Sequence, residues 1–349
     1  MTELRQHGLT AGQFLWVGTR GQMEETLVPR AGLQLETIRG GPIVGVPLRE
    51  SVMNAAKLTW SLGKTARLLR RFRPDVLFMT GGYVNVPVAL LAWLRRIPAV
   101  IYLPDVEPGT AIKALSRLAD KVACTTPASR RYFRPGKAVV TGYPVRPELR
   151  EAVQMSQKAA LATFDLAPGR PTLLVFGGSR GARSINRALM AILPTLLAEG
   201  VQVIHLSGTL GWPEVERHAA TLAPGQQALY RASPYLHEQM GAAFRAADLV
   251  VARAGASMLG EGPAFGLPAV LVPYPYAWRY QKVNADYLVA RGAAVRLDDE
   301  LLFEQLLPTV LGLLRDGARL QAMAEAAGAL DVPDAAANLA GLITGLSQR

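Results

Sequence analysis

The sequence contains a single cysteine, Cys124, among its 349 residues. One cysteine excludes an internal disulfide framework and a cysteine metal cluster, so we expect this thiol to be buried. The four histidines show none of the spacings typical of metal ligands. Apolar runs fall far short of the roughly 20 residues that a membrane-spanning helix needs, and no signal-peptide pattern is visible. We therefore expect a protein that is cytosolic or attached to the inner face of a membrane.

Acidic residues are scarce in the first part of the chain. Residues 1–150 hold 22 Lys and Arg against 10 Asp and Glu, whereas residues 151–349 hold 16 against 17, and the net charge is +11. A basic field favours nucleic acid, an anionic membrane surface or a phosphorylated substrate. No nucleic-acid-binding module is recognisable, so we expect no nucleic-acid partner and favour the other two.

The stretch TLLVFGGSRGARSIN, residues 172–186, is typical of a strand, a glycine loop and a helix. Glycines let the backbone approach an anion closely, and the first N–H groups of the helix are unpaired at the positive end of its dipole. Ser179 adds a hydroxyl donor for the same phosphate. Many doubly wound domains have a glycine-rich turn after a strand that binds no ligand, so this loop alone does not establish phosphate binding.

Two further loops of the second half carry groups suited to a nucleotide sugar. In RAGASMLGE, residues 253–261, small residues offer backbone N–H groups to a second anion, and Glu261 can accept hydrogen bonds from two sugar hydroxyls. A glutamate in a first helical turn is also simply a good dipole partner. In the third loop, from residue 273, two prolines and two tyrosines precede Gln281, whose amide suits hydroxyls. No Walker lysine motif indicates ATP hydrolysis, and no acidic residue after strand 201–206 supports a nicotinamide cofactor.

Strands alternate with helices along the chain, which predicts parallel sheets and an α/β fold. Strands are expected in the second half near residues 172–176, 201–206, 227–230, 248–252, 268–272 and 293–297. The proline-containing stretch 142–147 breaks all periodicity, which indicates an interdomain linker. We expect one domain over residues 1–145, a second over 146–330 and a C-terminal helix over 331–349.

A long amphipathic helix is predicted from residue 51 to residue 72, with one apolar and one basic face. It is either a packed helix with a solvated basic face or, with Arg95 and Arg96, a peripheral membrane contact.

Motifs along nearly the whole chain resemble those of the MurG family of membrane-associated glycosyltransferases, part of glycosyltransferase family 28. They are VGTRGQMEETLVP, MTGGYVNVPVAL, VTGYPVRPEL, FGGSRGARSIN and ARAGASMLGEGPAFGLPAVLVPYPYAWRYQKVNA. The resemblance implies a GT-B fold, in which two Rossmann-like doubly wound parallel-sheet domains face a cleft. It also implies an inverting, metal-independent transfer, with no cofactor, of N-acetylglucosamine from its UDP sugar to undecaprenyl-linked lipid I.

Carried over by position, the resemblance implies roles for individual residues. Ser179 and Arg146 would lie at the donor diphosphate, Leu236 at the uracil through its backbone, Glu261 on the ribose hydroxyls and Gln281 on the N-acetylglucosamine. Residues around the phosphates and nucleoside would be Ala256, Ser257, Met258, Leu259 and Gly260. Residues on the acceptor side would be Gly81, Gly82 and Tyr83. The resemblance also implies a protein held peripherally on the anionic, cytoplasmic face of the cell membrane. For the helix at 51–72 it favours the peripheral membrane contact over the packed helix with a solvated basic face.

The sequence departs from the family pattern in two places. The family opens with a strand and a GGTGGH loop, which are missing here, so we expect the true start to lie upstream; without that strand the apolar edge of the strand at 14–17 would be exposed. The family's HEQN stretch is here YLPD, residues 102–105, which puts the acceptor in question. Asp105 is a candidate general base by position, or alternatively a loop-capping residue before a helix.

Three other functions stay open on the sequence alone. A related GT-B transferase would use a different acceptor, which the YLPD stretch favours. A UDP-sugar epimerase would need no acceptor, and a non-enzymatic donor-binding protein would fit the missing first loop.

Overall fold

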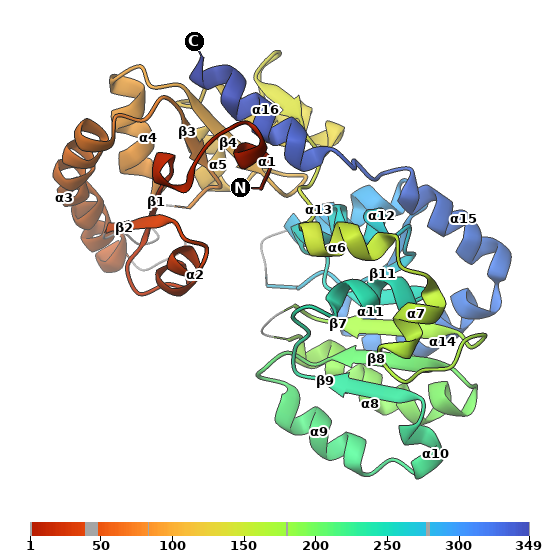
Figure 1. Cartoon of the computed structure of the whole chain (residues 1–349). Coiled ribbons are helices and arrows are strands. Elements are labelled where there is room, and N and C mark those ends of the chain that lie inside the picture. The colour runs from red at the N-terminus through yellow and green to blue at the C-terminus, as the bar shows by residue number, and fades with distance from the viewer. Residues whose placement is uncertain (1, 39–47, 83, 179–180, 277–279, 349) are drawn as a thin grey trace. The chain divides into compact units, whose positions relative to one another are not determined.

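The computed structural model of this chain describes residues 2–38, 48–82, 84–178, 181–276 and 280–348, without the side chains of residues 48 and 50–59. The chain divides into two compact units (Figure 1). The first comprises Met1–Pro104, Pro108–Gly142 and Asp334–Arg349, and the second comprises Asp105–Glu107 and Tyr143–Pro333. The division at Gly142 falls within the expected linker, and the C-terminal helix groups with the first unit.

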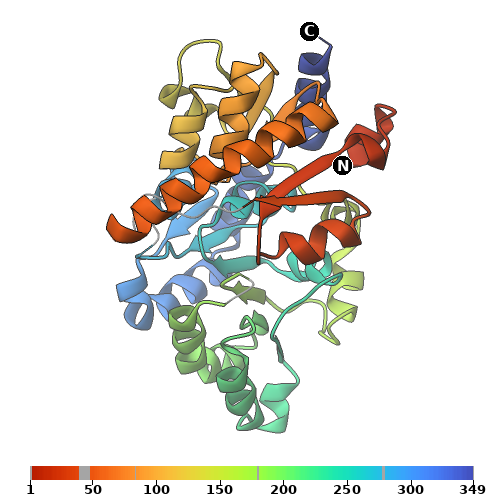
Figure 2. The same ribbon diagram turned by 90° about the vertical axis from the view of Figure 1, so that its left-hand side faces the viewer.

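The first unit contains two parallel sheets with helices around them. Its strands are β1 (Leu15–Thr19), β2 (Gln34–Ile38), β3 (Leu77–Met79), β4 (Ala99–Leu103), β5 (Lys121–Cys124) and β6 (Ala138–Val140). Its helices are α1 (Thr2–Gln6), α2 (Glu24–Arg30), α3 (Leu48–Phe72), α4 (Asn85–Leu94), α5 (Thr110–Leu115) and α16 (Ala335–Ser347), with 3₁₀ turns η1 (Ala11–Gln13) and η2 (Pro127–Tyr132). The predicted long helix is present as α3, the long orange helix of Figure 2, and it begins three residues earlier than expected.

The strands of the first unit form two separate sheets in the described part of the chain. Strand β1 pairs with β2, and the other four strands follow the order β3-β4-β5-β6. The side chains of Trp16 on β1 and Phe78 on β3 are 41% and 38% exposed.

Helix α16 covers one face of the four-stranded sheet. Its Leu339 and Ile343 pack against Val100 and Tyr102 of β4. The Tyr102 hydroxyl lies 2.9 Å from the Thr125 hydroxyl oxygen, so this side chain is a core residue with a satisfied polar end. The opposite face buries Cys124, as expected, and burial raises the pKa of this thiol to about 12.

The second unit is built on one six-stranded parallel sheet. Its strands are β7 (Thr172–Phe176), β8 (Gln202–Leu206), β9 (Tyr230–Ser233), β10 (Leu249–Ala252), β11 (Ala269–Leu271) and β12 (Ala294–Arg296). Its helices are α6 (Pro147–Val153), α7 (Gln157–Ala162), α8 (Arg183–Ala198), α9 (Trp212–Ala220), α10 (Pro224–Gln227), α11 (Met240–Ala246), α12 (Glu261–Ala264), α13 (Tyr280–Val289), α14 (Leu302–Arg315) and α15 (Gly317–Gly328), with η3 (Ala256–Leu259) and η4 (Asp299–Leu301).

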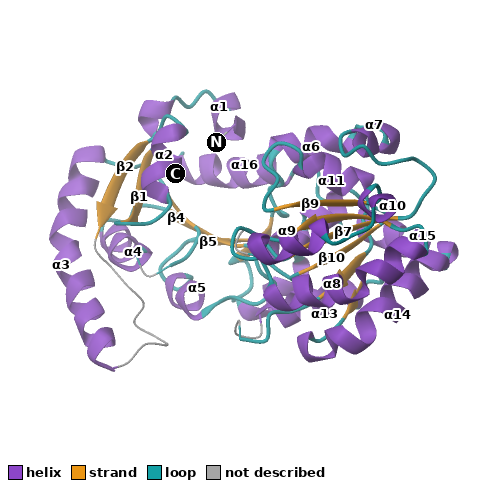
Figure 3. Ribbon diagram, turned by 90° about the horizontal axis from the view of Figure 1, so that it is seen from below, coloured by secondary structure: helices purple, strands orange, loops and turns teal. Residues whose placement is uncertain are grey.

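Helices lie on both faces of this sheet (Figure 3). Helices α8 and α14 pack together on one side, and α11 packs with α6 and α7 on the other. The inner strands β7, β8, β10 and β11 are buried throughout, as a parallel sheet covered on both faces requires, whereas the edge strands β9 and β12 are partly exposed. No helix in the described part of the chain is long and apolar enough to cross a membrane.

One predicted strand of this unit is misplaced. The strand expected near residues 227–230 begins only at Tyr230, because Pro224 starts the short helix α10, which occupies the preceding residues. Proline fits the first turn of a helix, where its missing N–H is not needed. The other five strands lie within one residue of the predicted positions.

Candidate functional site

The carboxyl edge of the six-stranded sheet brings the three predicted loops together. The strand order is β12-β11-β10-β7-β8-β9, so the chain builds outward from β7 on one side and then returns to β10 on the other. Strands β10, β7 and β11 are neighbours, and their loops begin at residues 253, 177 and 272. Open α/β sheets bind ligands at this reversal point, outside the carboxyl ends of the strands.

The glycine loop after β7 requires its glycines. A Cβ on Gly177 would lie 2.3 Å from the Ala182 Cβ, and one on Gly181 would lie 2.0 Å from the Ser207 carbonyl oxygen. Gly178 and Gly181 also have φ angles of +89° and +80°. Such a turn excludes side chains and brings backbone N–H groups to the start of α8, where Ala182 supplies no side-chain cap. Ser179 lies outside the described residues.

The second loop contains Glu261 at the start of α12. Its side chain is 12% exposed, and its Oε1 lies 3.9 Å from an Arg146 guanidinium nitrogen. Burial raises the pKa of this carboxyl, against the opposing effects of Arg146 and of a hydrogen bond with Ser257. A carboxylate with so little exposure to water needs hydrogen-bond donors within the protein or a ligand. A pair of sugar hydroxyls can supply them.

The residues of this loop differ in what they can offer a ligand. Ala256 and Ser257 are partly exposed, whereas the Met258 and Leu259 side chains are buried. Gly260 is also buried, and a Cβ there would lie 2.4 Å from the Tyr143 Cβ. Met258 and Leu259 can therefore meet a ligand only through their backbone.

The third loop and α13 carry Gln281. Its Oε1 accepts a hydrogen bond from the Tyr274 N–H at 2.9 Å, which ties the loop to the first turn of the helix. Leu236 lies half-buried in the loop that follows β9, at the same edge of the sheet.

Asp105 belongs to the second unit, together with Val106 and Glu107. Its carboxylate accepts a hydrogen bond of 2.8 Å from Asn284 Nδ2, and burial raises its pKa. Asn284 also accepts from the Val106 N–H at 3.0 Å and donates to the Ala254 carbonyl at 3.1 Å. The capping role considered for Asp105 is wrong, because Gly109 occupies the N-cap of α5.

Arg253 is a residue that the sequence analysis missed. Its guanidinium donates to the Ser184 hydroxyl at 2.7 Å and to the carboxylate of Asp299, and Ser184 itself donates to Asp299 at 2.8 Å. It also reaches the carbonyl oxygens of Val272 and Pro273, both at 3.3 Å. One side chain therefore ties all three loops together. An arginine directly after a buried strand was the only signal available in the sequence.

The acceptor-side residues predicted in the first unit lie after β3. Gly81 and Gly82 have φ angles of +96° and +92°, and the Asn85 amide donates to the Gly81 carbonyl. Tyr83 lies outside the described residues.

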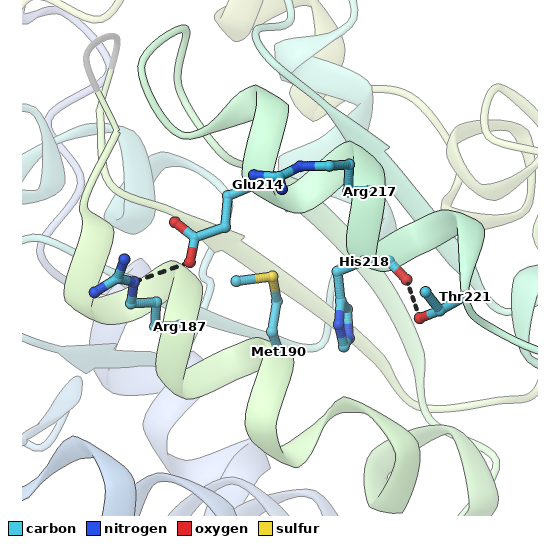
Figure 4. A pocket seen from close by; sticks show the side chains of 6 residues that line it. All are labelled: Arg187, Met190, Glu214, Arg217, His218 and Thr221. Carbon is cyan, nitrogen blue, oxygen red and sulfur yellow. Dashed lines mark hydrogen bonds and ion pairs between the residues drawn. The ribbon is translucent and has the colours of Figure 1, made fainter.

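A groove of about 520 Å³ lies elsewhere on the second unit, between α8 and α9 (Figure 4). Its wall includes an ion pair of 2.9 Å between Arg187 and Glu214, and Thr221 donates to the His218 carbonyl. Its lining residues are Arg187, Met190, Glu214, Arg217, His218 and Thr221, none of them a predicted site residue. Within the described residues, no group of three or more His, Cys, Asp or Glu is placed to hold a metal ion.

A doubly wound domain whose reversal point carries a glycine loop, a buried glutamate and an amide-bearing helix is typical of α/β proteins that bind a ligand at the carboxyl edge of the sheet. The model of the glycosyltransferase family 28 C-terminal domain matches residues 172–339, and that of the N-terminal domain matches residues 1–124. The chain belongs to glycosyltransferase family 28, and within it to the MurG enzymes.

Individual relatives support this assignment. The UDP-N-acetylglucosamine--N-acetylmuramyl-(pentapeptide) pyrophosphoryl-undecaprenol N-acetylglucosamine transferase of Roseiflexus sp. (strain RS-1) is 43% identical, over 96% of this chain and 84% of its own length. The transferase of the same name from Halalkalibacterium halodurans is 36% identical, over 93% and 88%. The crystal structure of Acinetobacter baumannii MurG superposes with a TM-score of 0.77 at 26% identity, over 99% of this chain and 93% of that one.

Proposed function

We propose that this chain transfers N-acetylglucosamine from UDP-N-acetylglucosamine to lipid I, which gives lipid II in peptidoglycan synthesis. The observation that carries the proposal is the junction of three loops at the reversal point of the second sheet, with buried Glu261 among them. Family membership supports the same reaction, because the curated relatives carry its name.

In the proposed site the donor lies on the second unit. The N–H groups at the start of α8 and along residues 256–260 receive the diphosphate, with Ser179 and Arg146 beside them. The Glu261 carboxylate accepts hydrogen bonds from the two ribose hydroxyls. The backbone of Leu236 contacts the uracil, and Gln281 binds the N-acetylglucosamine.

The reaction is a direct displacement at the anomeric carbon, which inverts its configuration. An acceptor hydroxyl oxygen forms the new bond to this carbon while the bond to the UDP oxygen breaks. Fixed N–H groups and the Arg146 guanidinium stabilise the negative charge that develops on the departing UDP. The hydroxyl proton passes to a general base. Asp105 is a candidate for this role by position, and its carboxylate already accepts a hydrogen bond from Asn284.

The first unit is proposed to face the acceptor and the membrane. Gly81, Gly82 and Tyr83 would form the acceptor side. Trp93 and Leu94 at the end of α4 are 54% and 61% exposed, next to exposed Arg95 and Arg96. Apolar and basic side chains in one exposed turn suit an anionic bilayer surface. This supports a peripheral position on the cytoplasmic face of the cell membrane.

Not all of the basic face of α3 is available to a membrane. Lys64 and Arg71 form ion pairs of 3.3 and 2.9 Å with Glu36 of β2. Burial raises the pKa of Glu36, but the hydrogen bonds and charges of these two cations outweigh it and the net shift is downward. Arg67 and Arg70 of the same helix are exposed. Sedimentation with vesicles containing anionic lipid, against neutral vesicles and at increasing salt, tests this contact.

The test of the reaction is UDP release from UDP-N-acetylglucosamine in the presence of a lipid I analogue. The proposal expects release that depends on the acceptor. Release without acceptor would indicate hydrolysis. Conversion of the UDP sugar into an epimer, with no UDP released, would indicate an epimerase. UDP binding with no release would indicate a donor-binding protein or a different acceptor. The replaced YLPD stretch favours a different acceptor as the second candidate, and a panel of lipid-linked acceptors tests it.

The donor assignment has its own test at Glu261. Glu261→Gln keeps the volume but supplies one acceptor oxygen in place of two, so UDP binding should weaken about tenfold. Glu261→Ala should weaken it at least as much. Equal affinity for UDP in all three proteins would remove Glu261 from the donor site.

A further inference from the structure

A chain of buried hydrogen bonds lies beneath the donor-binding edge of the second unit. His205 of β8 is completely buried. Its Nδ1 lies 2.7 Å from the Tyr230 hydroxyl, and its Nε2 lies 3.1 Å from Asn186 Oδ1. Asn186 is 2% exposed and donates from Nδ2 to the Ser207 carbonyl oxygen at 2.9 Å. The chain thus runs from an outer strand, across β8, to the first turns of α8.

The partners fix the direction of every bond in this chain. Because Asn186 Nδ2 donates to a carbonyl, its Oδ1 faces His205 and can only accept. His205 must therefore carry its proton on Nε2, which leaves Nδ1 to accept from the Tyr230 hydroxyl. A neutral imidazole satisfies all these groups, as buried polar groups require.

The end of the chain meets the glycine loop. The Ser207 carbonyl, which receives the Asn186 bond, is the group that a Cβ on Gly181 would approach to 2.0 Å. Gly211 packs against the same two groups, since a Cβ on it would lie 2.3 Å from Asn186 Nδ2 and 2.7 Å from the Ser207 carbonyl oxygen. The glycine turn, the carbonyl and the amide are therefore in direct contact, and a shift in one moves the others.

We propose that Asn186 and His205 are positioning residues for the donor diphosphate, with Tyr230 satisfying the other ring nitrogen of His205. They hold the Ser207 carbonyl as a fixed support for the Gly181 turn and thereby aim the N–H groups at the start of α8. None of the three touches the donor, and the inference rests on the proposed function.

The test measures the UDP affinity of the whole 349-residue chain by calorimetric titration. His205→Asn removes the donor to Asn186, because its amide reaches only the Nδ1 position, and UDP binding should weaken about tenfold. His205→Gln reaches the Nε2 position, keeps that donor and should stay within about threefold of the native affinity. Asn186→Asp replaces the donor to Ser207 with an acceptor oxygen and should weaken UDP binding by about tenfold or more.

The matched control is Thr172→Val at the opposite end of the same sheet. Thr172 is buried, and its hydroxyl accepts from Gln202 at 3.1 Å, so its removal costs a buried hydrogen bond far from the loop. It should lower the melting temperature without changing UDP affinity. In an active enzyme the KM for the acceptor should stay unchanged in the positioning variants while the KM for the donor rises.

Each outcome decides between two readings. Native UDP affinity in His205→Asn and Asn186→Asp, with a melting temperature lowered as in Thr172→Val, would show a purely structural network and overturn the inference. Equal losses in His205→Gln and His205→Asn would also overturn it. A native chain that binds no UDP contradicts the proposed function itself, whereas native binding with unaffected variants contradicts only the positioning role.

Discussion

Protonation of His205 should destabilise the second unit below pH 6.5. Burial in the sheet, with a smaller effect of the nearby His218, lowers the pKa of His205 to about 3. The groups that face its ring in the described part of the chain are Tyr230 of β9, Asn186 of α8 and His218 of α9, and none is a carboxylate that would favour the imidazolium. The folded protein therefore keeps this imidazole neutral where the unfolded chain would protonate it.

The size of the effect follows from linkage. The unfolded pKa of about 6.5 lies above the folded one, so the unfolded state binds more protons and stability falls as the pH falls. The contribution is fully present above pH 6.5 and is lost between there and pH 3. One proton corresponds to about 1.4 kcal/mol per pH unit, which amounts to about 2 kcal/mol between pH 7 and pH 5.

The assay compares the native protein with His205→Gln, which has no ionisable group at this position. Urea unfolding at several pH values between 5 and 7 gives the stability, and peptide-resolved hydrogen exchange over strand β8 assigns it to the second unit. Carboxylates titrate in both proteins, so the difference between the two slopes isolates the imidazole. Identical slopes would refute the reasoning and would mean that His205 can charge without leaving the fold.

Three substitutions test the loops directly. Gly181→Ala places a Cβ against the Ser207 carbonyl at a positive φ and should weaken UDP binding about tenfold or more in a titration; unchanged affinity would show that the loop can shift freely. Arg253→Lys cannot bridge three loops with one ammonium and should raise the donor KM about tenfold in steady-state kinetics, while an unaltered KM would contradict its bridging role. Asp105→Asn still accepts from Asn284 and should keep kcat within a few-fold, whereas a loss of about a hundredfold or more would identify Asp105 as the general base.

The local pattern of the sequence was sufficient for the second sheet and for its loops. Apolar runs followed by glycines placed β7 and the turn at Gly181, because a buried parallel strand and a tight turn each have a strong local signature. The error at β9 arose where Pro224 began a helix inside a stretch that looked extended. Such short elements depend on a single turn and are weakly encoded.

Contacts between distant residues could not be predicted in this way. Arg253 meets Asp299, 46 positions later, and nothing near Asp299 indicates that it would face this loop. Tyr230 and His205 are 25 positions apart and read as ordinary strand residues. Asp105 resembles a capping residue in the sequence because a helix follows it, but in the folded chain its carboxylate accepts a hydrogen bond from Asn284. These pairs depend on strand order, which local propensity does not specify.

The return of the C-terminal helix to the first unit has a practical consequence for dissecting the protein. The apolar face that Leu339, Ile343 and Leu346 cover belongs to the sheet that contains Val100, Tyr102 and Ala123, far earlier in the chain. A fragment that stops at Gly142 would leave Tyr102 and its neighbours exposed to solvent. The complementary fragment would carry α16 with its apolar face exposed and would tend to aggregate. Anyone wishing to study the first unit alone should graft the segment from Asp334 onward behind Gly142 through a flexible tether, since no single cut yields two self-sufficient pieces.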